Sequence, residues 1–213
     1  MKPKKVQLSS LYGEFTPPFQ MSDDFITKSI QVIDQYVHIT EEEVRRRYSE
    51  PSRYFHTTEH LNDILSQIFD KYEGSEDLVP MVIAGIFHDI VYDPQRKDNE
   101  EKSVELLRYL SPPSTHEVWV KAEKIILATK THDKIHELIS DFNKFDCSIL
   151  DRDYPELLKW EEQIYNEYKF AGWEEYKERR IQFLKLSIPE HKKNFENLNK
   201  LIEYIEHEYN NIG

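Results

Sequence analysis

Residues 78–92 read LVPMVIAGIFHDIVY and hold the longest apolar stretch of the chain. Apolar side chains fall nearly all round the helical wheel here, which is typical of a central buried helix rather than an amphipathic surface helix. The uncharged part, residues 78–87, is about half as long as the ~20 residues that a bilayer-spanning helix needs. We therefore expect a buried central helix and no membrane partner.

Helical patterns extend on both sides of this segment, and patterns typical of strands are nearly absent. Apolar side chains recur at spacings of three and four residues. Capping signals mark three helix starts, at Ser22, at Thr40 with Glu43, and at Ser114 with Glu117. With a less regular stretch at 131–153, the expected helices cover about 25–37, 40–48, 58–74, 78–92, 99–110, 114–126, 154–170, 173–187 and 189–210.

The composition fits one all-α domain. The chain has 213 residues, five glycines and a single cysteine, Cys147. That length suits one domain, and the single cysteine excludes an internal disulfide framework. The scarcity of glycine excludes a glycine-rich phosphate loop and disfavours an all-β fold. We expect one domain over residues 1–213, with its core at about 22–187 and a C-terminal helix at about 189–210.

The charge balance argues against nucleic acid as a partner. The chain has 40 Asp and Glu against 28 Lys and Arg, a net charge of −12. A chain this acidic is repelled by a phosphate backbone unless its basic residues are segregated. The basic start, Met1 to Lys5, is not followed by the apolar segment of a secretory signal. We expect a cytoplasmic protein that binds neither nucleic acid nor a membrane.

The apolar segment ends on His88 and Asp89, two potential metal ligands. Burying an ionisable pair among apolar side chains is costly unless a partner or a metal compensates. If the pair stood alone, a single hydrogen bond to the histidine ring would be the simpler explanation. Three further polar segments accompany it: RYFHTTEH at 53–60, NEEKS at 99–103 and ATKTH at 128–132.

Together these segments resemble the HD superfamily of metal-dependent phosphohydrolases, in particular its small single-domain branch. The resemblance covers about residues 41–186 and implies an HD-domain-like helical bundle. It rests on motifs in a fixed order: RRYSEPSRYFH at 46–56, IFHDIVYD at 86–93 followed by Asn99, Glu100 and Ser103, then Asp146 followed by SIL at 148–150, and finally Tyr168 and Arg180.

The resemblance assigns the metal ligands to His56, His88, Asp89 and Asp146. Two imidazoles and two carboxylates form a mixed nitrogen and oxygen site. Such a site suits a divalent Mn, Fe, Co, Zn or Mg ion that keeps exchangeable waters.

The register of the last ligand has alternatives. The branch usually has Asp-x-Asp-Leu at this point, whereas this chain has KFDC at 144–147. Asp151 or Asp153 could therefore take the place of Asp146. We favour Asp146 because apolar Ile149 and Leu150 follow it at the expected offset.

Four other side chains are candidates for catalysis. Asp93 and Glu100 are candidate general bases or neighbours of the metal ligands, and Arg53 and Lys130 are candidates for binding a phosphate. Glu100 also suits the first turn of a helix on electrostatic grounds alone, and either cation could simply be a surface residue.

Further histidines could complete the site. His60 follows His56 by four residues and therefore shares its helical face. There it could support a metal ligand, contact substrate or simply pack. His132 and His136 could support a second metal ion.

These assignments predict hydrolysis of a phosphate ester on a small phosphorylated metabolite or nucleotide. The expected partners are this substrate and, in a homo-oligomer, further copies of the chain. Two alternatives stay open: a di-iron oxygenase of HD fold, for which His116, His132 and His136 are available, and a non-catalytic nucleotide-sensing module. The HxxEH pattern at 56–60 also matches an inverted zinc-protease motif, but a protease does not account for the His-Asp pair at 88–89.

Overall fold

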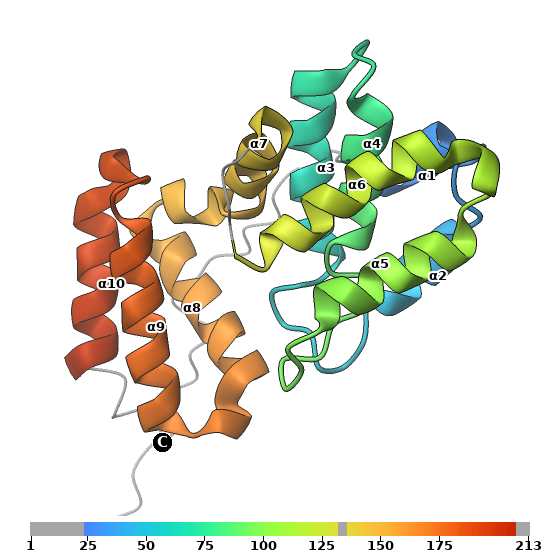
Figure 1. Ribbon diagram of the computed structural model, residues 1–213. Helices are drawn as coiled ribbons and strands as arrows, with labels where there is room; N and C mark the ends of the chain where they lie inside the picture. The colour runs from blue at the N-terminus through green and yellow to red at the C-terminus, as the bar shows by residue number, and fades with distance from the viewer. Residues whose placement is uncertain (1–23, 132–135, 208–213) are drawn as a thin grey trace, which may run out of the picture.

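The computed structural model describes residues 24–131 and 136–207, and helices joined by turns and irregular segments make up these ranges (Figure 1). They contain no strand, so the predicted all-α class is confirmed. The helices are α1 (Phe25–Ile33), α2 (Glu41–Arg47), α3 (Thr58–Tyr72), α4 (Leu78–Phe87), α5 (Asn99–Leu110), α6 (His116–Thr129), α7 (Glu137–Asp146), α8 (Tyr154–Tyr168), α9 (Trp173–Ser187) and α10 (Phe195–His207).

Local capping accounts for some of the helix starts. Thr40 Oγ1 accepts the backbone N–H of Glu43 at 3.2 Å at the start of α2, as predicted. The cap expected at Ser22 lies outside the described residues. The helix start predicted at Ser114 with Glu117 is wrong. Ser114 lies within a 3-10 turn, and α6 begins after that turn without a side-chain cap.

Helix α4 is the buried centre that its apolar sequence predicts. Helices α1, α3 and α6 pack around it, and its residues from Pro80 to Phe87 are buried. Gly85 lets α3 approach α4 closely, since a Cβ at this position would lie 2.9 Å from Leu65 Cδ2. A larger side chain would push the two helices apart or force Leu65 to move.

Helix α4 ends at Phe87, whereas the sequence pattern predicts a helix through Tyr92. The side chain of Arg53 donates to the backbone carbonyls of Asp89 at 2.7 Å and Ile90 at 3.3 Å. The backbone N–H of Val91, which a continuing helix would donate to the Phe87 carbonyl, instead donates to Ser103 Oγ at 3.2 Å. The apolar residues after the His-Asp pair therefore form an irregular segment that arginine stabilises.

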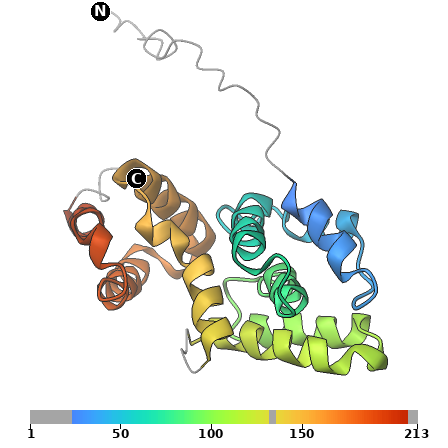
Figure 2. The ribbon, with the colours of Figure 1, turned by 90° about the horizontal axis from the view of Figure 1, so that it is seen from above.

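The stretch 131–153 is more regular than expected, since it contains α7 and a 3-10 turn at Ser148–Asp151. Buried apolar side chains form two clusters, one within α1–α7 and the segments joining them, and a second built from Leu150, α8, α9 and α10. Figures 1 and 2 show α8–α10 side by side on one flank and α1–α6 on the other. A single domain over 1–213 stays a prediction. Among the described helices, none combines the length and the apolar character that crossing a bilayer requires.

Candidate metal centre

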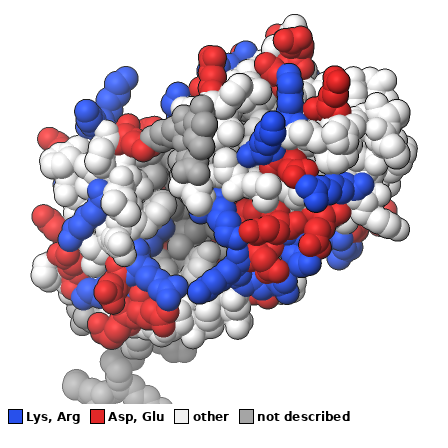
Figure 3. All heavy atoms as spheres, viewed as in Figure 1, with Lys and Arg blue, Asp and Glu red and all other residues white. Residues whose placement is uncertain are grey.

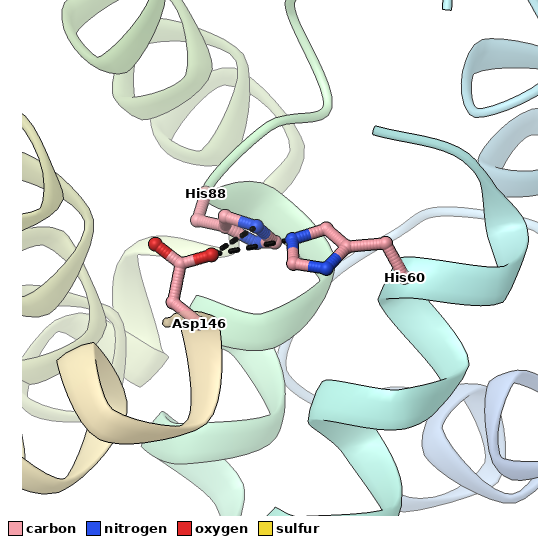
Figure 4. A group of neighbouring side chains, drawn as sticks. All are labelled: His60, His88 and Asp146. Atoms are coloured by element: carbon pink, nitrogen blue, oxygen red, sulfur yellow. Dashed lines mark ion pairs between the residues drawn. The ribbon is translucent and has the colours of Figure 1, made fainter. Parts of the chain in front are cut away.

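Three side chains from separate helices meet between the two flanks (Figure 4). His60 lies in the first turn of α3, His88 directly follows α4, and Asp146 ends α7. Asp146 Oδ1 lies 3.2 Å from His60 Nε2 and 3.8 Å from His88 Nε2. Metal–ligand bonds of about 2 Å place ligand atoms about 3–4 Å apart, so these three groups could hold a metal ion.

The two imidazoles are oriented for this role. His88 Nδ1 lies 2.8 Å from the Gly85 carbonyl oxygen and donates to it, which leaves the lone pair of Nε2 for another partner. Nε2 of His60 and Nε2 of His88 are both buried, and each faces a carboxylate oxygen 3.2 Å away without a well-directed hydrogen bond to any described residue. Buried imidazole nitrogens that face carboxylates in this way are suited to share a metal ion with them.

Asp89 and His56, the other two predicted ligands, lie beside this cluster. Asp89 Oδ2 is 3.2 Å from His88 Nε2 and 3.9 Å from His56 Nε2. The structure thus brings together the four residues predicted as ligands and adds His60 to them. Three imidazoles and two carboxylates match the nitrogen and oxygen donors that first-row divalent metals bind.

The position of Asp146 distinguishes it from the two other aspartates considered for this role. Asp151 pairs with His191 Nδ1 at 3.0 Å. Asp153 caps α8, where its Oδ1 accepts the backbone N–H of Glu156 at 3.1 Å. Both carboxylates are therefore used elsewhere in the fold.

The remaining histidines do not join the cluster. His116, at the start of α6, and His136, which caps α7, are both exposed, and neither belongs to the group that could hold a metal. His132 lies outside the described residues. Glu59, the acidic residue of the HxxEH pattern, is also exposed, which disfavours the protease interpretation.

Opposite charges compensate each other inside the cluster. Burial by itself would lower the pKa of His88. The negative charges of Asp89 and Asp146 have the larger effect and raise this pKa to about 9. Burial also opposes ionisation of Asp89, but His88 and His56 hold the pKa of Asp89 far below its ordinary value. A metal ion that binds here must therefore displace a proton from His88.

Glu167 of α8 holds the segment that carries His56, a role that sequence reasoning missed. The side chain of Glu167 has no exposed surface. Its Oε1 accepts the backbone N–H groups of Tyr54, Phe55 and His56 at 2.7, 2.7 and 3.1 Å. Its Oε2 accepts from the Tyr92 hydroxyl and lies 2.6 Å from His56 Nδ1. A carboxylate on Nδ1 leaves Nε2 of the imidazole available to a metal.

The side chain of Arg53 stabilises the backbone of the segments that carry His56 and Asp89. This side chain has no exposed surface, and its guanidinium donates to the carbonyls of His56, Asp89 and Ile90. It also pairs with Glu50 at 3.3 Å. The binding of substrate phosphate by Arg53 stays a prediction, which this geometry disfavours because backbone carbonyls already take most of its donors.

The two candidate bases differ in position. Asp93 is exposed, and its Oδ1 accepts the backbone N–H of Gln95 at 2.9 Å within a turn, so its carboxylate stabilises that turn. Glu100 is half-buried and lines the cleft described below, and burial raises its pKa. Lys130 lies 3.9 Å from Glu100 and also pairs with Glu101. The structure therefore favours Glu100 over Asp93.

A cleft of about 690 Å³ opens between the two flanks and reaches the predicted ligands. Figure 3 shows it as a hollow at the centre of this face, with Lys and Arg side chains on both sides. A cleft of this size suits a small-molecule ligand, and its cations favour an anionic one. The cationic residues that line it are Arg96, Lys97, Lys130, Arg179 and Arg180.

The all-helical fold and the cluster of His60, His88 and Asp146 are compatible with an HD-type fold. Comparison of the chain with protein-family models, with curated proteins and with solved structures gives no match.

Proposed function

We propose that the protein is a metal-dependent phosphohydrolase of HD type that acts on a small phosphorylated metabolite or nucleotide. One observation carries the proposal. Two buried imidazole nitrogens each face a carboxylate oxygen at 3.2 Å, where a cleft lined with cations reaches them. A phosphate ester supplies the negative charge that such a cleft favours.

Four side chains are the proposed metal ligands. His60, His88, Asp89 and Asp146 would hold the ion, with His56 beside them. Such an ion lowers the pKa of a bound water toward ~7 and neutralises charge on phosphoryl oxygens.

Two residues of the cleft would act on the water and the phosphate. Glu100 would orient the attacking water and accept its proton, because burial raises the pKa of this carboxylate and makes it a better base. Lys130 would bind a phosphoryl oxygen after leaving its ion pair with Glu101.

A screen of phosphorylated metabolites and nucleotides with Mn, Co, Mg and Fe tests the proposal. We expect metal-dependent release of phosphate from at least one compound class. Asp146→Ala should abolish this turnover, whereas Asp151→Ala, at an aspartate that pairs with His191 away from the cluster, should retain it. No metal-dependent turnover on any compound would refute the proposal.

The presence of a third histidine also suits a second function, oxidation by two irons. Three imidazoles and two carboxylates provide more donors than a single ion with exchangeable waters needs. Metal analysis of protein purified without air discriminates between the two. Two irons per chain would favour oxidation, and one labile divalent ion would favour hydrolysis. Tight nucleotide binding without product under any metal would instead favour a sensing module.

A further inference from the structure

Arg180 of α9 is a buried arginine with an unsatisfied guanidinium. It is 8% exposed, its Nε donates to Glu161 Oε2 at 2.7 Å, and its guanidinium carbon lies 3.9 Å from the centre of the Trp160 ring. Its Nη2 is buried and has no hydrogen-bond partner among the described residues. A guanidinium has five N–H donors in a planar fork, so most of its donors remain for a ligand.

Arg53 shows how a structural arginine is satisfied in the same molecule. Backbone carbonyls and Glu50 accept from each of its three guanidinium nitrogens, and it does not line the cleft. Arg180 does line the cleft, and only its Nε has a protein acceptor among the described residues. An unpaired donor edge at the wall of a cleft is typical of an anion-binding arginine.

Arg180 belongs to a different wall of the cleft from the metal ligands. Its neighbour Trp160 contacts Phe55 with ring centres 6.1 Å apart, and Phe55 in turn packs on His60 at 4.5 Å. These two aromatic rings connect Arg180 to the cluster, and no contact between Arg180 and the cluster residues occurs within the described part of the chain.

We propose that Arg180 forms a second anion-binding site in the cleft, and that the substrate carries a carboxylate or second phosphate group for it. This inference rests on the proposed function and narrows its substrate class to molecules with two anionic groups. The phosphate ester binds at the metal cluster, and the second anion binds at the guanidinium edge of Arg180. The cleft volume of about 690 Å³ accommodates a molecule that reaches both groups.

The test compares probes with one and two anionic groups by calorimetric titration of the Mn-loaded protein. The probes are methylphosphonate, alkylene bisphosphonates and ω-phosphonocarboxylates, the last two with chains of increasing length. We expect at least one bis-anion to bind about ten- to a hundredfold more tightly than methylphosphonate, the range for hydrogen bonds to a charged group. The two bis-anion series distinguish a carboxylate from a phosphate as the second group.

Arg180→Gln should bring the bis-anion down to the affinity of methylphosphonate and leave methylphosphonate binding unchanged. Arg108→Gln is the matched control, because Arg108 is 53% exposed, pairs with Glu123 and does not line the cleft. This variant should keep the affinity gain of the bis-anion over methylphosphonate. Since Arg180→Gln leaves the buried Glu161 without its cation, the double variant Glu161→Gln/Arg180→Gln removes both charges and should lose the gain equally.

Three results would overturn the inference. One is that no bis-anion binds more tightly than methylphosphonate to the wild type. Another is that the affinity gain of the bis-anion survives in both Arg180 variants. The third is that these variants lose affinity equally for methylphosphonate and the bis-anion. The last result would place Arg180 on the same phosphate as the metal. Failure of the proposed function is a separate outcome, since it appears as absence of metal-dependent hydrolysis and not as absence of the affinity gain.

Discussion

Glu167→Gln tests whether His56 binds the metal. The amide oxygen of glutamine can still accept the backbone N–H groups of 54–56 that Oε1 accepts. The amide NH₂ that replaces Oε2 is a donor, and it faces the Tyr92 hydroxyl and His56 Nδ1, each at 2.6 Å. The hydroxyl can rotate and become an acceptor. The imidazole can accept at Nδ1 only by moving its proton to Nε2.

A His56 that carries its proton on Nε2 has no lone pair there for a metal. Loss of the outer carboxylate that orients a ligating histidine typically lowers metal affinity about 10–100-fold, which corresponds to about 1.4–2.8 kcal/mol. The free energy of unfolding of the metal-free protein should also fall, by about 1.5–3 kcal/mol, because hydrogen bonds to a buried charged group are replaced by neutral ones.

Mn affinity by calorimetry and denaturant unfolding with a chelator measure the two effects separately. Glu162→Gln is the matched control, since Glu162 lies on the same helix and is exposed, and it should leave both quantities unchanged. If Glu167→Gln lowers the stability but keeps the wild-type Mn affinity, then His56 is not a ligand and the argument from its tautomer fails.

Three further predictions follow from the charges of the site. Asp89→Ala should abolish the rise in melting temperature that excess Mn gives the wild type, because it removes an anionic ligand; an equal rise in both proteins in a thermal scan would show that Asp89 does not bind the metal. Since His88 has a pKa of about 9 without metal, Mn affinity should rise by up to about tenfold per pH unit from pH 7 to 9 and level off above; calorimetric titrations that find no pH dependence would contradict this. Burial would raise the pKa of Glu167, but its hydrogen bond with His56 lowers it to about 2 from 4.5, so the stability from this carboxylate, about 3 kcal/mol, is present above pH 4.5 and is lost as the pH falls toward 2. Denaturant unfolding between pH 5 and 2.5 should therefore show a smaller loss of stability in Glu167→Gln than in the wild type.

Local sequence patterns were sufficient to predict most of the helices and the ligand segments. His88 and Asp89 stand out because they interrupt an apolar run, and Asp146 because apolar residues follow it at the expected offset. Each of these signals lies within a few residues of the group that it identifies. The end of α4 was not predictable in this way, because the groups that bind the backbone after it belong to Ser103 and Arg53, which are distant from it in the chain.

The roles of Glu167, Arg53 and Arg180 depend on contacts with residues that are distant in the chain. Glu167 lies in an amphipathic helix among other glutamates. Its neighbours in the sequence do not indicate that it is buried whereas Glu162 is exposed. Arg53 and Arg180 are both buried, yet one is satisfied by carbonyls and the other has open donors. Such differences arise from contacts between segments about 20 to 110 residues apart, which single-sequence patterns do not encode.

The glycine at position 85 links the choice of metal to the packing of the core. Helices α3 and α4 carry His60 and His88, and their separation is set where the backbone of Gly85 meets Leu65 and Ile68, both fully buried. A methyl group there would meet Leu65 at 2.9 Å, and such overpacking typically costs about 1–3 kcal/mol and displaces backbone. Moving the two helices apart would widen the gap between the imidazole nitrogens, which favours ions of larger radius. Ionic size selectivity would then be determined by a residue that touches no ligand atom of the metal, and the apolar core and the chemistry of the site would be under selection together.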